Sequence, residues 1–507
     1  MTIRHGVLRG LSGLPTCLFQ SSIVNLQSSI LCDDRSGGKR ELIVRTKVVL
    51  KRLRAALLFI VAWAAGAGVA AVGADTPPQL RYVVIISRHG VRSPTWDTTR
   101  LNQYAAEPWP EWGVPPGNLT PHGRVLMQLM GNYYREWLSS EHLLTPQGCG
   151  DAGRIYIHAD MDHRTLETGR ALAETLLPGC PVAVHSEPEG SRDPLFDPIA
   201  AGVAKPDWEI AAGAVRERLG DNPKQFLELH RAAFEALQFV LAGKEGAPKK
   251  LIEPPGEFSV SITGESIQLS EPLSVASTLS EDLLLEYTEG MQGKDLGWGR
   301  LDVNTLFRVL ELHAVYSDLT RRTPYLARAR GSNLLAHILA SMEQALTGKA
   351  VPGALGPPGT AVLILSGHDT NLSNLSGMLG LSWHLPGYQP DDTPPGGALI
   401  FSLWQQPGTA PCFVRTQYLA QTLQQMRNTA PLTMAGPPAK EDVAVAGCGS
   451  ATAGIGCPWD TFDKSLWKAI DHRFVSIQPM GVRSQKATST RRRNLPSMAY
   501  QETCRAR

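Results

Sequence analysis

The sequence predicts an α/β fold: a central mixed, mainly parallel sheet flanked by helices, with an inserted smaller α-helical lobe. Three observations support this prediction. Short runs of β-branched and aliphatic residues recur along the chain and alternate with segments of helical spacing, which is typical of a sheet covered on both faces. The stretch 193–294 breaks the alternation, because helix-like segments dominate it. We therefore expect a discontinuous α/β domain of residues 75–192 and 295–473 around a helical lobe of residues 193–294.

The first elements follow from apolar patterning. A continuous apolar run at 82–86 indicates a strand buried on both faces. Thr120 and Pro121 have the character of a helix N-cap and a first helical residue. An apolar stripe at helical spacing follows them, formed by Leu126, Leu129, Met130, Tyr133 and Trp137. A second strand is expected at 154–158, and a second helix at about 166–177.

The later elements divide between the lobe and the rest of the sheet. Within the lobe, the segments 223–242 and 280–291 have helical patterning. Strand patterning returns afterwards at 361–365, 398–404 and 412–419. These strands complete the predicted sheet.

Charge is distributed unevenly along the 507 residues. Residues 1–54 carry ten Lys/Arg and three Asp/Glu, and residues 474–507 carry seven Lys/Arg and one Glu. The body between them therefore has 32 Lys/Arg against 43 Asp/Glu, a net charge of −11. An acidic body argues against a nucleic-acid-binding surface. Residues 474–507 lack apolar periodicity and are interpreted as a disordered basic tail.

A targeting segment is expected at 51–74. Lys51, Arg52 and Arg54 form a positive n-region, an uncharged stretch rich in Ala follows, and small residues before Asp75 suit a cleavage site. The alternative is a transmembrane anchor, but the stretch is rich in Ala and Gly rather than in Leu and Ile. We expect a cleaved signal peptide, only transient membrane contact, and a periplasmic or secreted protein. Residues 1–50 stay unassigned.

The eight cysteines form no C-x-x-C metal or redox motif. Two close pairs lie in the body, Cys149 with Cys180 and Cys448 with Cys457, and an oxidising compartment would let them close. Spacing alone leaves four free thiols as an equal alternative. Cys412 has no obvious partner in the sequence.

Three of the apolar strands end in charged turns. The first turn begins at Arg88-His89 and includes Arg92, the second is residues 162–165 with Arg164, and the third contains His368-Asp369. Ligands of open α/β sheets bind beyond the carboxyl ends of the strands. If the three strands are parallel neighbours, their turns meet in one crevice.

The residue types in this crevice suit a phosphate ester. Guanidinium groups present fixed forks of donors that match phosphate oxygens. A neutral imidazole is a competent nucleophile, and a neighbouring carboxylic acid can protonate a leaving alkoxide. Each residue alone could instead be a surface charge or a core histidine, and a His-Asp pair also suggests a metal ligand set. A third ligand at suitable spacing is missing nearby, so we expect no metal and no cofactor.

Residues 80–473 resemble the histidine acid phosphatases, branch 2 of the histidine phosphatase superfamily, and within it the bacterial periplasmic phytase and acid phosphatase group. The signatures are Arg88-His89-Gly90-x-Arg92-x-Pro94 and His368-Asp369. Further matching segments are Leu119-Thr120-Pro121-x-Gly123, Pro194-Leu195-Phe196, Gly297-Trp298-Gly299-Arg300, Arg322-Thr323-Pro324, Thr393-Pro394-Pro395-Gly396-Gly397 and Gln421-Thr422-Leu423-Gln424-Gln425-Met426-Arg427.

The resemblance implies a role for each residue. His89 would be the phosphorylated nucleophile and Asp369 the proton donor. Phosphate would be bound by Arg88, Arg92, Arg164 and His368, and Thr95 would line the substrate pocket. His-Asp-Thr at 368–370 resembles phytases, whereas glucose-1-phosphatases have His-Asp-Ser. The family spacing also implies the disulfides Cys149–Cys180 and Cys448–Cys457. Two other bridges of the relatives lack cysteines here, one of them in the helical lobe.

We therefore expect a monomeric phosphoric monoester hydrolase that acts at acid pH through a phosphohistidine, on phytate (myo-inositol hexakisphosphate). The alternatives are a broad-specificity acid phosphatase, a glucose-1-phosphatase, or a mutase that returns the phosphoryl group to its substrate. A non-catalytic protein that binds a phosphate ligand is the alternative of another class. The expected partner is a small phosphate monoester, with no nucleic acid.

Overall fold

The computed structural model describes residues 17–21, 28–32, 77–243, 259–264, 266–269, 271–407, 412–448 and 456–477. The chain forms two compact units, Met1–Asp75 and Thr76–Arg507. In the first unit, β1 (Cys17–Ser21) and β2 (Ser28–Cys32) pair as an antiparallel hairpin, an element that the sequence analysis did not predict. The predicted signal peptide and all but the first four residues of the predicted tail lie outside the described residues.

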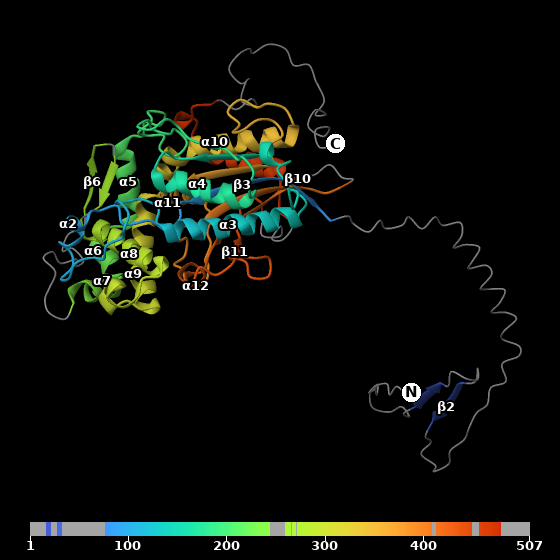
Figure 1. Ribbon diagram of the computed structural model, residues 1–507, viewed down its shortest axis with the longest axis horizontal. Helices are drawn as coiled ribbons and strands as arrows, with labels where there is room; N and C mark the ends of the chain where they lie inside the picture. The colour runs from blue at the N-terminus through green and yellow to red at the C-terminus, as the bar shows by residue number, and fades with distance from the viewer. Residues whose placement is uncertain are drawn as a thin grey trace, which may run out of the picture. The chain divides into compact units, whose positions relative to one another are not determined.

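The second unit contains a mixed eight-stranded sheet (Figure 1). Along the sheet the order is β11-β10-β9-β3-β8-β4-β5, and β12 pairs with β10. The strands β3, β8, β4 and β5 are parallel, whereas β9, β10, β11 and β12 add antiparallel pairs on one side. The strands are β3 (Gln79–Arg88), β4 (Ile155–Ala159), β5 (Val184–His185), β8 (Val362–Gly367), β9 (Ala398–Gln405), β10 (Cys412–Ala420), β11 (Ala439–Asp442) and β12 (Cys457–Pro458).

Helices cover both faces of the sheet, as the apolar runs predict. Val83 and Ile85 of β3 belong to the core formed with α3 (Pro121–Ser140) and α4 (His163–Leu176). Val84 and Ile86 point the other way, into the core formed with α10 (Pro324–Thr347), α11 (Asp369–Leu379) and α13 (Trp459–Ala469). Each such buried aliphatic side chain contributes about 1.5–3 kcal/mol, so alternate β3 residues fix both layers.

Two helix starts bring functional residues into position. Thr120 caps α3 as predicted, because its hydroxyl accepts the amide of Gly123 at 2.8 Å and Pro121 occupies the first turn. The second helix, α4, begins at His163 rather than near residue 166. Arg164 therefore lies in its first turn instead of in a connecting loop. The hydroxyl of Thr165 tightens this turn by donating to the Asp162 carbonyl at 2.6 Å.

The remaining helices gather mostly beside the sheet, where Figure 1 shows α6, α7, α8 and α9 together. Both predicted lobe helices are present, the first of them in two pieces, α6 and α7. The second predicted helix is α8, which starts nine residues earlier than predicted. It packs against α9, a helix that lies beyond the predicted end of the lobe. A short β6–β7 hairpin also lies in this region. The elements are α5 (Trp208–Leu219), α6 (Pro223–Glu228), α7 (Arg231–Ala242), β6 (Val260–Thr263), β7 (Ser266–Leu269), α8 (Glu271–Glu289) and α9 (Val303–Thr320). Two short helices are α2 (Thr98–Leu101) and α12 (Leu423–Arg427), and α12 packs against α8.

The chain ends of the second unit differ slightly from the expected boundaries. Phe474, assigned to the tail from the sequence, is buried beside Ala204 and Ala329. The apolar core runs without a break from the sheet into the helices of residues 193–294. The assignment of this stretch as a separate lobe therefore stays a prediction.

In the described part of the chain, no helix combines the length and apolar character that a membrane crossing requires.

Both cysteine pairs form disulfides, Cys149–Cys180 and Cys448–Cys457, and Cys412 is buried on β10. Cys149 and Cys180 are 31 residues apart. Closing a loop of that length restricts the unfolded chain and raises the free energy of unfolding by about 3–4 kcal/mol.

We expect the double variant Cys149→Ser/Cys180→Ser to unfold several degrees lower than the parent in thermal denaturation. Reducing agent should lower the melting temperature of the parent more than that of the variant. Equal melting temperatures for parent and variant would contradict this assignment of stability.

Candidate active site

The three charged turns meet at one edge of the sheet. β3 and β8 pair in parallel with Arg88 opposite Gly367, and β4 pairs in parallel with the other side of β8 with Ala159 opposite Ser366. The three strands therefore end at the same level. A cavity of about 700 Å³ opens beyond them. Its walls include the predicted residues His89, Arg92, Arg164, His368 and Asp369, together with Asp160, Asp162, Arg192 and Arg330.

The imidazole of His89 is fixed in one tautomer. The carbonyl of Gly90 can only accept, so the ring Nδ1–H donates to it, over 2.8 Å, and Nε2 keeps a free lone pair. Burial and then the positive charges of Arg164, Arg88 and Arg92 lower the pKa of His89 well below its ordinary value. A neutral ring with a free Nε2 is the state that a nucleophilic imidazole requires.

The backbone holds His89 at the junction of three segments. Its amide donates to the carbonyl of Gly367 at 2.9 Å, and its carbonyl accepts the amide of Gly396 at 2.9 Å. The next residue has to be glycine, because a Cβ on Gly90 would lie 3.0 Å from the Gly123 carbonyl oxygen and 2.8 Å from Met127. The signature glycine therefore lets the loop approach α3.

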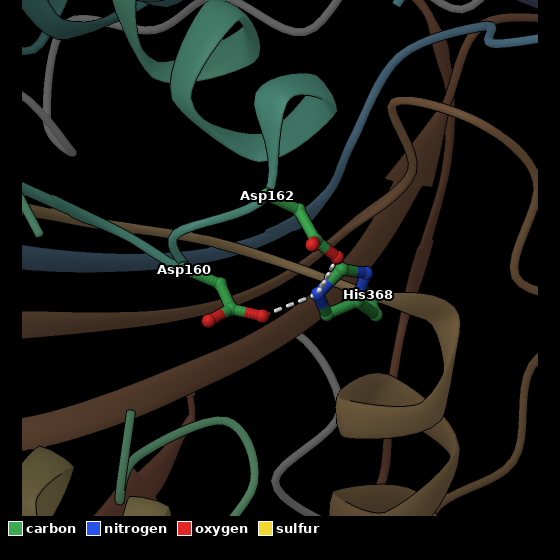
Figure 2. Close-up of side chains that lie close together, drawn as sticks. All are labelled: Asp160, Asp162 and His368. Atoms are coloured by element: carbon green, nitrogen blue, oxygen red, sulfur yellow. Dashed lines mark hydrogen bonds and ion pairs between the residues drawn. The ribbon is translucent and has the colours of Figure 1, made fainter. Parts of the chain in front are cut away.

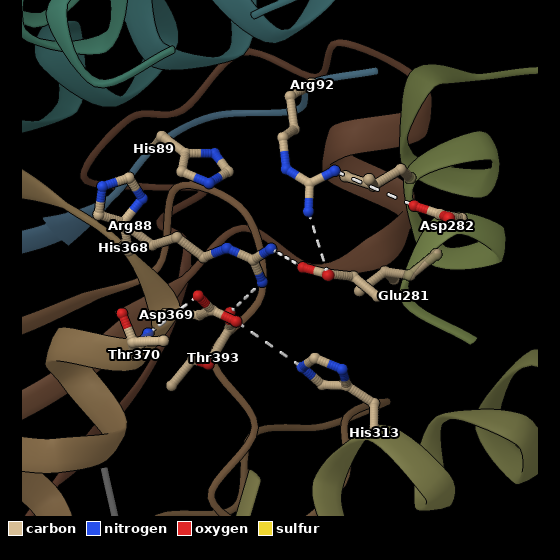
Figure 3. A network of polar contacts seen from close by, with 12 residues as sticks. Arg88, His89, Arg92, Glu281, Asp282, His313, His368, Asp369, Thr370 and Thr393 are labelled. Carbon is tan, nitrogen blue, oxygen red and sulfur yellow. Dashed lines mark hydrogen bonds and ion pairs between the residues drawn. The ribbon is translucent and has the colours of Figure 1, made fainter. Parts of the chain in front are cut away.

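Two of the predicted phosphate ligands are bridged by an acid from α8 (Figure 3). Glu281 pairs with Arg88 through one carboxylate oxygen and accepts from Arg92 through the other at 3.1 Å. Arg88 also donates to the Thr393 carbonyl at 2.6 Å. Burial alone would raise the pKa of Glu281, but Arg92 and Arg88 outweigh it and lower the pKa to about 2. The two arginines therefore favour the ionised form of Glu281, and its carboxylate orients both guanidinium groups. Arg88 lies behind the cavity wall rather than among its lining residues.

The third arginine, Arg164, belongs to a separate network with His368. Figure 2 shows His368 of this network with the two acids Asp160 and Asp162. His368 Nε2 lies 2.6 Å from Asp160 Oδ2 and 3.6 Å from Asp162 Oδ2. Arg164 pairs with Asp162 at 2.5 Å, and the Nη2 atom of Arg164 lies 3.4 Å from His368 Nδ1. The His368 ring also meets that of His89 edge to face, with centroids 5.6 Å apart. Asp160 and Asp162 therefore hold His368 and Arg164 at the wall of the cavity, close to His89.

Asp369 lies in the first turn of α11, next to the helix N-cap. Its Oδ1 accepts the amide of Thr370 at 2.9 Å, and its Oδ2 pairs with Arg321. His313 Nε2 is 3.9 Å from the same Oδ2. Burial raises the pKa of Asp369, but Arg321, Arg88 and His313 together bring it well below its ordinary value. These contacts favour the ionised form of the carboxyl group.

Thr95 is exposed and does not line the cavity, so its role stays a prediction. It lies near Arg164, since a Cβ built on Gly117 would be 3.7 Å from Thr95 and 3.6 Å from Arg164 NH1.

Among the described residues, two clusters have ligand atoms close enough for a metal: Asp160, Asp162 and His368, and Glu281, His313 and Asp369. In both, carboxylates are already paired with guanidinium groups. Guanidinium groups surround the cluster of Glu281, His313 and Asp369, and their positive charge disfavours a metal ion there. In the other cluster, Arg164 contacts both Asp162 and His368. These contacts favour a role in orienting the arginines and His368 rather than in holding a metal.

Sequence reasoning missed Asp160, Arg192 and Arg330 of the cavity wall. It also missed three residues that pair with the predicted ones: Glu281, His313 and Arg321. Glu281 and His313 lie on α8 and α9, far from the signature turns in sequence, and Arg321 follows α9 directly. Of these three, only Arg321 had a neighbouring signal, because Arg322-Thr323-Pro324 is one of the family segments.

The chain is similar in sequence and fold to known bacterial phosphatases. Phytase AppA of Escherichia coli (strain K12) is 38% identical over 74% of this chain and 89% of its own length. Glucose-1-phosphatase of Providencia rettgeri is 28% identical over 77% of this chain and 92% of its own length. The structure of Hafnia alvei phytase in complex with myo-inositol hexakis sulphate matches 79% of this chain and all of that chain, with a TM-score of 0.71 and 34% identity.

The family model of the histidine phosphatase superfamily (branch 2) matches residues 79–419, which span the sheet strands β3 to β10 and every residue of the cavity wall named above. The match therefore includes the His89 loop, the α4 start and the His368-Asp369 turn. Together with the phytase relative, it shows that this chain belongs to branch 2 of the histidine phosphatase superfamily.

Proposed function

We propose that this protein hydrolyses phosphate monoesters at acid pH in two steps through a phosphohistidine on His89. The observation that carries the proposal is the His89 imidazole, whose Nδ1 is bound to the Gly90 carbonyl and whose Nε2 is free, beside the guanidinium groups of Arg88, Arg92 and Arg164 that favour its neutral form. Phosphoryl transfer depends mainly on positioning and on neutralising charge. Three fixed cations next to one nucleophile meet both needs.

In the first step, the Nε2 lone pair of His89 attacks phosphorus, and the bond from phosphorus to the ester oxygen breaks. Asp369 in its protonated form transfers its proton to the departing alkoxide. In the second step, water attacks the phosphohistidine, Asp369 takes a proton from this water, and the P–N bond breaks to release phosphate. The arginines and His368 bind the phosphate oxygens throughout. An acid optimum follows, because Asp369 has to carry a proton when the ester binds.

We propose phytate as the substrate. Besides the predicted Arg92 and Arg164, the cavity wall carries two more arginines, Arg192 and Arg330. Arg330 is largely buried, with its pKa lowered by burial and by Arg321. Additional guanidinium groups around the cavity suit an ester that carries several phosphates. The names of the Escherichia coli and Hafnia alvei relatives agree with this substrate, whereas the Providencia rettgeri relative supports glucose 1-phosphate as the alternative.

A substrate panel distinguishes these possibilities. We expect phosphate release at acid pH to be fastest with phytate, as kcat/KM, and slower with glucose 1-phosphate and with nucleotides. A preference for glucose 1-phosphate would replace phytate but keep the chemistry. Transfer of the phosphoryl group back to substrate, without phosphate in solution, would indicate a mutase. Tight binding of phytate without any turnover would indicate a binding protein and contradict the proposal.

We also propose export to the periplasm or outside the cell and a monomeric state. Two disulfides support export, because such bonds persist in oxidising compartments. The mass of the mature protein, expected to begin near Asp75, checks this proposal.

A further inference from the structure

The proton donor of the proposed reaction is held by a residue outside the family signatures. Arg321 lies directly after α9, and its side chain is 14% exposed. The Nη1–H group of Arg321 donates to Oδ2 of Asp369. The other carboxylate oxygen accepts the Thr370 amide. Both oxygens thus accept from groups that can only donate, which is the hydrogen-bonding pattern of an ionised carboxylate.

This pattern conflicts with proton donation. The Thr370 amide is fixed by the first turn of α11, so it stays on Oδ1 whatever the protonation state. The proton that leaves with the alkoxide is therefore expected on Oδ2, where the Arg321 guanidinium also binds. An opposite charge within about 4–6 Å lowers a carboxyl pKa by roughly 1–3 units. Arg321 therefore competes directly with protonation of Asp369.

Other charged groups also face Asp369, and they limit what Arg321 can do alone. The charged groups are Arg88 at the end of β3, Arg164 on α4, Glu281 on α8 and His313 on α9 when it is protonated; the neutral phenol of Tyr418 on β10 faces Asp369 as well. Arg88 is already neutralised in part by Glu281, and Arg164 by Asp162. Among the arginines of the described residues, Arg321 alone pairs with the carboxylate itself, while His313 Nε2 lies 3.9 Å from the same oxygen. It is therefore the group whose charge Asp369 feels most directly.

We propose that Arg321 is the positioning residue of the proton donor: it fixes the direction of the Asp369 carboxyl group and sets the highest pH at which phosphoryl transfer to His89 proceeds. A bound phosphate ester brings negative charge into the cavity that Asp369 lines, which offsets the effect of the surrounding cations and lets Asp369 take up a proton. Arg321 stays nearby in that complex, so its charge still limits the pH range. This inference rests on the proposed role of Asp369 as proton donor.

The test is the pH profile of phosphoryl transfer in Arg321→Gln. Removing the cation raises the pKa of Asp369, so the acid keeps its proton to higher pH. With glycerol 2-phosphate, a poor leaving group, the alkaline limb of single-turnover transfer at saturating substrate should move up by roughly 1–2 pH units. Arg321→Lys keeps the charge and should keep the limb near its original position. Arg321→Met, which retains the volume of the stem, repeats the test if the Gln variant unfolds.

Arg322→Gln is the matched control. Arg322 follows in sequence and is equally buried, but it pairs with Asp391 at 3.0 Å and does not contact Asp369. Its variant should change stability without moving the limb. If the Arg321→Gln variant is folded and the alkaline limb of its pH profile does not move, the inference is overturned, provided that Asp369→Asn still selectively slows transfer from poor leaving groups. If Asp369→Asn shows no such selectivity, the proposed role of Asp369 fails and the inference fails with it.

Discussion

The variant His89→Ala is expected to lose turnover by roughly 10⁴-fold or more while remaining folded, because no other group can form the covalent intermediate. In the structure the cavity offers no second free imidazole in the same place: His368 is engaged by Asp160 and Arg164. Initial rates with phytate and with p-nitrophenyl phosphate measure the loss, and it should be large for both. A good leaving group cannot compensate for a missing nucleophile.

His337→Ala is a suitable control for His89→Ala. His337 is also largely buried, but it binds the Gly353 carbonyl and lies outside the lining of the cavity. Its variant should show a stability cost with nearly unchanged kcat/KM. If His89→Ala retained multiple turnovers above a small fraction of the parent rate, His89 would be a phosphate ligand at most.

The second large effect concerns Asp369→Asn, which keeps the shape of the side chain but cannot donate a proton as an acid. An inositol or sugar alkoxide needs that proton, whereas p-nitrophenolate leaves without it. We expect the substitution to slow transfer from phytate or glucose 1-phosphate by roughly 10²–10⁴-fold, typical of general acid–base catalysis. Transfer from p-nitrophenyl phosphate should slow much less, and a burst of p-nitrophenol is expected if dephosphorylation becomes limiting.

The comparison of leaving groups is needed because the substitution also removes a negative charge and leaves Arg321 without its partner. That change affects every substrate alike. The ratio of the single-turnover rates for a good and a poor leaving group cancels this effect of the lost charge, so it reports proton donation alone. Equal slowing of good and poor leaving groups would show that Asp369 positions the site instead of acting as the acid.

The elements that could be predicted from the sequence are those with a strong local pattern. The apolar run at 82–86 lies within β3, and Thr120-Pro121 starts α3 as expected, because burial and capping act over a few residues. The start of α4 was misplaced, since polar His163 and Arg164 gave no apolar signal although both are helical. Consequently the sequence indicated Arg164 as a site residue but not that the first helical turn orients it.

The candidate site divides along the same line. His89, Arg92, Arg164, His368 and Asp369 stand beside strand ends, so sheet topology alone brings them to one cavity. Glu281 and Arg321 reach the same place from helices whose packing depends on the whole apolar core. No motif surrounds Glu281 in the sequence, and the family segment beside Arg321 begins only at Arg322. The acids and bases that tune the site are therefore harder to predict than the residues that carry the chemistry.

The most direct measurement of the central proposal is to trap the phosphoenzyme. Protein mixed with excess phytate or p-nitrophenyl phosphate for milliseconds is quenched in alkaline denaturant, where a phosphohistidine survives, and the phosphorylated peptide is identified by mass. Phosphate is expected on His89, forming and decaying at rates that account for turnover, and absent from His89→Ala. Phosphate on a different residue, or steady turnover with no phosphoenzyme at any time, would contradict a covalent mechanism at His89.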